Sequence, residues 1–111
     1  MADWYVKHLG ATVARAGGPP QYGHFLNVGG TLFEIYNNPA VPVPDYGKVE
    51  VMQLHLAFAS ENLKADRDRL LKAGARVIVD IYSTPDGDEI MMLRDPWNVP
   101  IQFVKRKQPM L

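Results

Sequence analysis

Three polar residues of this 111-residue chain have side chains that could bind a metal ion or act on a small molecule. Glu34 carries a carboxylate, His55 an imidazole and Gln102 an amide oxygen. Each lies near the middle of a stretch in which apolar and polar residues alternate, the pattern of a strand with two different faces. Donors of these types suit a borderline divalent ion such as Zn, Ni, Mn or Fe(II) in a site that keeps open positions.

The alternation also predicts the surroundings of these side chains. His55 shares its face with Ala57, Glu34 shares its face with Tyr36, and Gln102 lies opposite the apolar residues of its own strand. A face that only met solvent would carry polar residues scattered along it. One strong polar group per strand, flanked by apolar residues, indicates a lined pocket instead.

Spacing alone leaves an alternative open. The separations from Glu34 to His55 and from His55 to Gln102 are 21 and 47 residues, which match no local zinc motif. In the alternative, His55 is a core histidine bonded to a backbone carbonyl, Glu34 is a surface residue and Gln102 is solvated.

Composition excludes several classes of function. The chain has 12 Lys+Arg, 12 Asp+Glu and no cysteine. A net charge of zero argues against nucleic acid or an anionic membrane as a partner. The lack of cysteine excludes disulfides, thiolate metal sites and a thiol nucleophile, and no apolar run approaches the roughly 20 residues of a membrane span. We therefore expect a cytoplasmic protein with one domain and a small-molecule substrate.

The elements that position the three residues follow from periodicity, glycine and proline. In the first half we expect a helix over 2–9 ended by Gly10, then strands over 11–15, 22–28 and 31–37, and then a proline-rich linker over 38–50. In the second half we expect a strand over 51–59, a helix over 61–73, and strands over 75–82, 89–94 and 99–105. The second helix should have Ser60 as its N-cap and Leu63, Leu70 and Leu71 on one face.

The two halves of the chain are repeats. HLGATVAR and KAGARVIV superpose with Gly10 on Gly74, an offset of 64 residues. His55 precedes Gly74 by 19 residues, whereas only nine residues precede Gly10, so the first half starts inside its own helix. Either Met1 is an internal methionine of a longer chain, or this form folds without the first strand. In the second case an open sheet edge would favour a homodimer.

The repeated order, together with WYVKHLG, TLFEIYN, LHLAFAS and LRDPWNVPIQFVKR, resembles the vicinal oxygen chelate superfamily of glyoxalases, bleomycin-resistance proteins and extradiol dioxygenases. The resemblance implies an α+β fold of two βαβββ modules in a cup-shaped, mixed or antiparallel sheet, the first module lacking its initial strand. It implies one domain over 1–111, with module one at 1–37, a linker at 38–50 and module two at 51–106.

The resemblance also implies a metal held by the first and last strands of each module. Glu34 and His55 match such positions, Gln102 stands where glutamate is usual, and the fourth position has no counterpart. An amide cannot act as a general base, so Glu34 is the carboxylate left for proton transfer, a role that burial beside Tyr36 would favour. Gln102 also argues against the extradiol dioxygenase branch.

Two functions follow from the resemblance. The first is a divalent-metal-dependent lyase or isomerase similar to glyoxalase I, with Glu34, His55 and Gln102 as metal ligands and a vicinal-oxygen substrate in the cleft. The alternative is a metal-free protein of the bleomycin-resistance type that binds or sequesters a small molecule.

Overall fold

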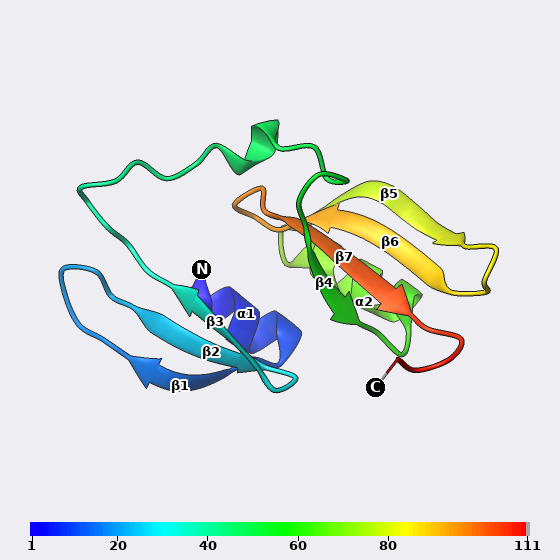
Figure 1. Ribbon diagram of the computed structural model, residues 1–111, viewed down its shortest axis with the longest axis horizontal. Helices are drawn as coiled ribbons and strands as arrows, with labels where there is room; N and C mark the ends of the chain where they lie inside the picture. Colours follow the sequence, from blue (N-terminus) through cyan, green and yellow to red (C-terminus); the bar gives the residue numbers. More distant parts are fainter. Residues whose placement is uncertain (111) are drawn as a thin grey trace. The chain divides into compact units, whose positions relative to one another are not determined.

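A computed structural model describes residues 1–110 and contains two compact units. Unit 1 is Met1–Pro44 and unit 2 starts at Asp45, so the boundary falls inside the predicted linker. Each unit places one α-helix against one face of its own sheet (Figure 1). The predicted α+β fold class is confirmed.

Unit 1 begins with the helix α1 (Ala2–Leu9), which ends where the sequence predicts. Gly10 has a φ of 67°, and its cap N–H donates to the carbonyl of Tyr5. Glycine adopts this left-handed conformation without the steric penalty that a Cβ would bring. Tyr5 is the buried residue of the helix.

The sheet of unit 1 is antiparallel, in the order β1-β2-β3. Its strands are β1 (Thr12–Ala16), β2 (His24–Val28) and β3 (Thr31–Ile35). The predicted hairpin joins β2 to β3, because Gly29 and Gly30 have φ values of 58° and 88° and so supply the two positive φ angles of a tight turn. Leu26 on β2 is fully buried.

The sheet of unit 2 has four strands, in the order β4-β7-β6-β5. Its first and last strands in the chain, β4 and β7, are parallel neighbours, and the other pairs are antiparallel (Figure 1). The elements of this unit are β4 (Leu56–Ala59), α2 (Leu63–Lys72), β5 (Arg76–Ser83), β6 (Glu89–Arg94) and β7 (Pro100–Lys105).

The segment before β4 differs from its prediction. A short 3-10 helix, η1 (Tyr46–Lys48), lies within the predicted linker, and residues 51–54 form a turn instead of the start of a strand. The backbone N–H groups of Gln53 and Leu54 both donate to the Glu50 carbonyl, at 2.9 and 3.4 Å. These bonds curl the chain, so His55 comes directly before the strand.

Helix α2 also differs in its cap and in one face residue. Asn62, not Ser60, is the N-cap and accepts the Ala65 N–H, while Ser60 donates its hydroxyl to Asp66. Leu70 is fully buried as predicted, but Leu71 is 41% exposed. One residue turns a helix by about 100°, which carries Leu71 off the buried stripe.

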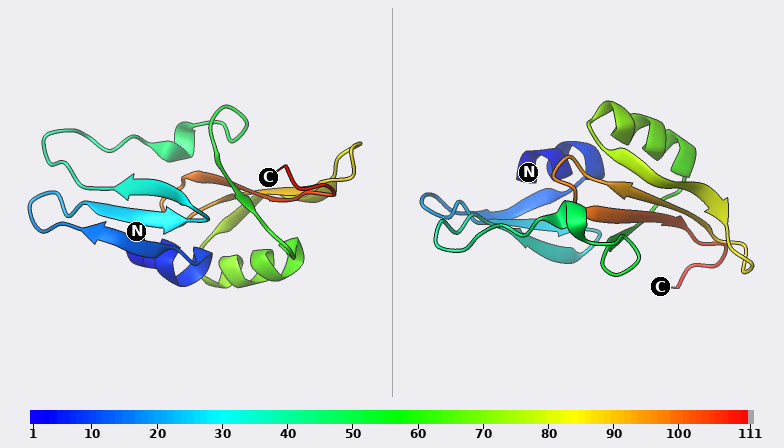
Figure 2. Two further views of the ribbon diagram at one scale, coloured as in Figure 1. Left: turned by 60° about the horizontal axis from the view of Figure 1, so that its bottom comes forward. Right: turned by 90° about the horizontal axis from the view of Figure 1, so that it is seen from above.

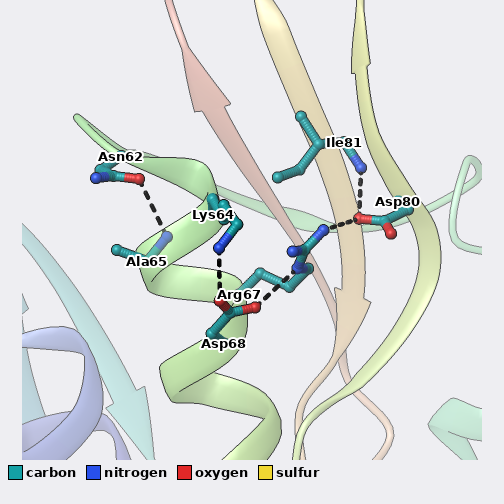
Figure 3. A network of polar contacts seen from close by, with 7 residues as sticks. All are labelled: Asn62, Lys64, Ala65, Arg67, Asp68, Asp80 and Ile81. Atoms are coloured by element: carbon teal, nitrogen blue, oxygen red, sulfur yellow. Dashed lines mark hydrogen bonds and ion pairs between the residues drawn. The ribbon is translucent and has the colours of Figure 1, made fainter.

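An exposed polar network joins α2 to the neighbouring strand β5 (Figure 3). Arg67 donates to Asp80 at 2.8 Å and to Asp68 at 3.2 Å, and Asp80 also accepts the Ile81 N–H. The hydrogen bond from Arg67 is the main reason that the pKa of Asp80 lies below its ordinary value. Ion pairs this exposed contribute little to stability, so we expect the network to add little to the packing of α2 on β5.

The sheet of unit 2 has two different faces. α2 and η1 lie on opposite sides of it (Figure 2). By strand register, one face carries the buried Met91, Leu93, Ile101 and Phe103, and the other carries the buried Met92, Val104 and Arg94 together with Gln102. Arg94 hydrogen-bonds the backbone at both ends of η1, so its face is the η1 side and the Met91 face lies under α2.

Candidate functional site

The structure brings His55 to the start of β4, the parallel neighbour of the strand that carries Gln102. Ala57 on β4 is the register partner of Gln102 on the parallel strand β7, and His55 lies two residues before Ala57. Residues two apart in an extended chain share a face. Gln102 and Ala57 therefore belong to the η1 side of the sheet, and His55 lies directly before β4, bonded to Val51 in the segment that follows η1.

The ring of His55 is oriented by a backbone hydrogen bond. Its Nδ1 lies 2.8 Å from the carbonyl oxygen of Val51 in the preceding turn. A carbonyl only accepts, so Nδ1 carries the hydrogen and Nε2 of the neutral ring keeps its lone pair. Within residues 1–110, Nε2 has no hydrogen-bond partner. The ring is half-buried and offers one nitrogen for a ligand.

Gln102 occupies the centre of its sheet. It is half-buried on β7, between Ala57 on β4 and Met92 on β6. Within the described part of the chain its side-chain amide has no hydrogen-bond partner. The amide oxygen is therefore available to a ligand or to water.

Glu34 lies on β3 of unit 1, opposite Phe25 on β2. Its predicted burial beside Tyr36 is wrong, because Glu34 is exposed and Tyr36 is 59% exposed. The buried side of this sheet is the opposite one, which carries Leu26. The carboxylate of Glu34 has no ion-pair or hydrogen-bond partner among residues 1–110.

Two other acidic side chains of unit 2, those of Asp88 and Asp95, already accept hydrogen bonds from neighbouring residues. Asp88 accepts from Arg106 at 2.7 Å and from the Lys107 backbone N–H at 2.9 Å, and these bonds hold its pKa below the ordinary value. Asp95 is buried and accepts the N–H groups of Trp97 and Val99, which closes the turn between β6 and β7. These carboxylates are therefore poor candidates for a ligand site.

Among residues 1–110, no group of three or more His, Cys, Asp or Glu side chains could hold a metal ion. The predicted set is not of that kind, since it has one His, one Glu and one Gln. The donor chemistry still fits a borderline divalent ion, because the imidazole, the amide oxygen and the carboxylate are each free to coordinate.

One residue near this face was missed by sequence reasoning. Arg94, at the end of β6, is only 9% exposed and donates to the carbonyls of Tyr46, Asn98 and Val49. Alternation along β6 could have indicated its position. Arg94 lies two residues after Met92, the register partner of Gln102, and so shares the face of Gln102. A charge at such a position requires buried partners.

Solved structures with the same fold include several glyoxalase-related proteins. The crystal structure of SMU.1112c is 26% identical, with a TM-score of 0.72 over 93% of this chain and 86% of that chain. A glyoxalase family protein from Enterococcus faecalis is 24% identical, with a TM-score of 0.67 over 91% of this chain and 82% of that one. A glyoxalase I mutant from Zea mays is 19% identical, with a TM-score of 0.72 over 96% of this chain and 40% of that one.

None of the helices formed by residues 1–110 combines the length and the apolar character needed to cross a membrane.

Two further comparisons concern the family of the chain. No curated protein sequence matches the chain. A family model, by contrast, matches residues 1–103, nearly the whole chain. The chain therefore belongs to the Glyoxalase/Bleomycin resistance protein/Dioxygenase superfamily.

Proposed function

We propose that this protein is a divalent-metal-dependent lyase or isomerase that acts on a small substrate with two adjacent oxygens. The observation that carries the proposal is the ring of His55, whose Nδ1 is bonded to the Val51 carbonyl while Nε2 stays free at the start of β4, the strand beside that of Gln102. Metal-binding histidines commonly donate their other ring nitrogen to a carbonyl or carboxylate in this way.

In this proposal His55 Nε2 and the Gln102 amide oxygen, both of unit 2, hold the ion. When bound, a divalent ion would polarise a carbonyl oxygen of the substrate. Glu34, of unit 1, stays the predicted third ligand and the predicted carboxylate for proton transfer. Gln102 cannot share in this transfer, because an amide does not accept a proton at neutral pH.

The test is metal analysis of the purified chain after loading with Ni or Zn and removal of excess ion. We expect stoichiometric metal in the parent and its loss in His55→Ala. His24→Ala is a matched control, because the Nδ1 of His24 also bonds a backbone carbonyl, that of Tyr22 at 2.6 Å, but this ring lies in unit 1. A parent protein without stoichiometric metal would contradict the proposal.

Activity separates binding from chemistry. The hemithioacetal of methylglyoxal and glutathione is the probe substrate, and Glu34→Gln should abolish its turnover. Gln102→Glu should strengthen metal binding and raise turnover, because a carboxylate is both the stronger ligand and a general base. Metal binding without turnover in both the parent and Gln102→Glu would limit the proposal to a metalloprotein with another substrate.

A metal-free binding protein is the second candidate. Within the described residues no three acidic or histidine side chains form a metal-binding set, and the central donor of β7 is neutral. This candidate predicts that bleomycin, or another aromatic ligand, binds equally well before and after treatment with a chelator. Titration of tryptophan fluorescence in both states measures that binding. The expected homodimer stays a prediction, and light scattering in solution tests it.

A further inference from the structure

Arg94 is a buried cation on the face of unit 2 that carries Gln102. It pairs in register with Pro100, and the residue two positions earlier, Met92, pairs with Gln102. Its relative exposure is 9%. Within residues 1–110 no carboxylate lies in ion-pair contact with it. A buried guanidinium without a counter-ion needs several strong acceptors.

Backbone carbonyls meet this need. Nη1 of Arg94 donates to Tyr46 at 2.9 Å and to Asn98 at 3.0 Å, and Nη2 donates to Val49 at 2.7 Å. The carbonyl of Asn98 belongs to the turn between β6 and β7. The other two belong to η1 and to its C-cap, so the guanidinium fastens the η1 segment to the end of β6.

The fastened segment leads directly to His55. Val51, two residues after Val49, is 3% exposed, and its carbonyl accepts from His55 Nδ1 at 2.8 Å. Between them the Glu50 carbonyl accepts two N–H groups and closes the turn. The turn is thus held at one end by Arg94 and at the other by β4, and the carbonyl that orients the imidazole lies inside it.

We propose that Arg94 is a positioning residue for His55. By holding the carbonyl of Val49, it fixes the turn in which the Val51 carbonyl selects the Nδ1–H tautomer and leaves Nε2 free. Arginine suits this role because its planar fork reaches three carbonyls from one rigid group, whereas a lysine ammonium is a single point. The consequence for metal affinity rests on the proposed function, but the selection of the tautomer does not.

The first experiment observes the tautomer directly. Long-range proton–nitrogen NMR of the imidazoles in mildly alkaline buffer distinguishes the two tautomers, and a His55→Gln spectrum assigns His55 among the three histidines of the chain. In the parent we expect the Nδ1–H form. In Arg94→Gln we expect a mixture of both forms, and in Arg94→Lys an intermediate mixture.

Arg67→Gln is the matched control, because Arg67 is also an arginine of unit 2 but pairs with Asp68 in α2 and with Asp80 in β5. It should keep the parent signature. Circular dichroism shows whether Arg94→Gln is folded. If the folded variant keeps the pure Nδ1–H form, the inference is overturned. Should Arg94→Gln fail to fold, Arg94→Lys decides: an intermediate mixture supports the inference and an unchanged signature overturns it.

The second experiment measures Ni and Zn affinity of the same variants. Loss of an orienting partner of a metal ligand typically weakens affinity by about 10-fold or more, and we expect this for Arg94→Gln but not for Arg67→Gln. If the parent binds no metal, the proposed function fails while the tautomer measurement still tests Arg94. If Arg94→Gln changes the tautomer but binds metal like the parent, the link from Arg94 to the metal is wrong.

Discussion

Strands β3 and β7 hold the same place in the two units, as the last strand of each, and each carries one polar residue near its middle. β7 lies between β4 and β6, whereas β3, within the described residues, pairs with β2 alone. Along β7 only Lys105 is exposed, but three of the five residues of β3 are exposed. The same alternating pattern therefore produces a buried strand or an open one, according to the neighbours that the sheet provides.

The difference extends to the candidate ligands. Gln102 is half-buried in the sheet interior, while Glu34 is exposed. A carboxylate in solvent needs no partner, whereas a polar group in a sheet interior needs a ligand, a water or a hydrogen bond. His55 and Gln102 of unit 2 are thus the more buried candidate ligands, and substitutions should affect the two units unequally.

The largest expected effect comes from truncating matched leucines in the two sheets. Leu93 on β6 is 0% exposed and Leu32 on β3 is 60% exposed. Leu93→Ala should lower the free energy of unfolding by about 2–5 kcal/mol, because it leaves a cavity in a packed core. Leu32→Ala should change it by less than about 0.5 kcal/mol. Urea denaturation measures both, and equal losses would break the comparison.

An intermediate effect is expected at the glycines that follow the two helices, Gly10 as the C-cap of α1 and Gly74 directly after Ala73, the C-cap of α2. Gly10 and Gly74 occupy equivalent positions of the repeat and have φ values of 67° and 99°. Alanine at either position must adopt a left-handed conformation, which costs about 1–2 kcal/mol. A Cβ at Gly74 would also lie 3.3 Å from Pro96 Cγ, whereas nothing lies within 4 Å at Gly10.

Gly74→Ala should therefore destabilise the protein more than Gly10→Ala. Thermal unfolding of both variants beside the parent gives the order. The reverse order would mean that the repeat does not place these two residues in comparable caps.

The smallest expected effect concerns the hairpins. The turn between β2 and β3 is closed by glycines, but the turn between β5 and β6 is tied by Asp88 to Arg106 and Lys107. The hydrogen bond from Arg106 is the main reason that the pKa of Asp88 lies below its ordinary value of 3.8. A lowered pKa in the folded state stabilises the protein above the unfolded-state pKa, and this contribution disappears as the pH falls through the folded-state pKa.

Asp88→Asn should therefore lower the unfolding midpoint slightly at neutral pH and have no effect well below pH 3.8. Asp86→Asn, in the same turn, is the control and should change neither midpoint. Calorimetric scans at both pH values are the measurement. A difference between parent and Asp88→Asn that persists in acid would assign the effect to packing instead of charge.

Much of the fold could be predicted because its signals are local. Gly10 ends α1, Gly29 and Gly30 form the hairpin turn, and β6 spans Glu89–Arg94 as predicted. The errors fall where a distant or competing contact decides. Asn62 caps α2 because the helix starts at Leu63, and the Ser60 hydroxyl bonds Asp66 and the Asn62 N–H instead. Residues 51–54 curl because two N–H groups reach the Glu50 carbonyl.

By itself the sequence determined the residue types of the candidate site, the strands that carry Glu34 and Gln102, and the family, because alternation and repeat spacing are written in the order of residues. Only the tertiary structure decided that Glu34 is exposed, that the Val51 carbonyl leaves Nε2 of His55 free, and that Arg94 holds the segment before it. Exposure depends on which strands flank a residue. The hydrogen bond from Arg94 to Val49 joins positions 45 residues apart, and no local pattern encodes it.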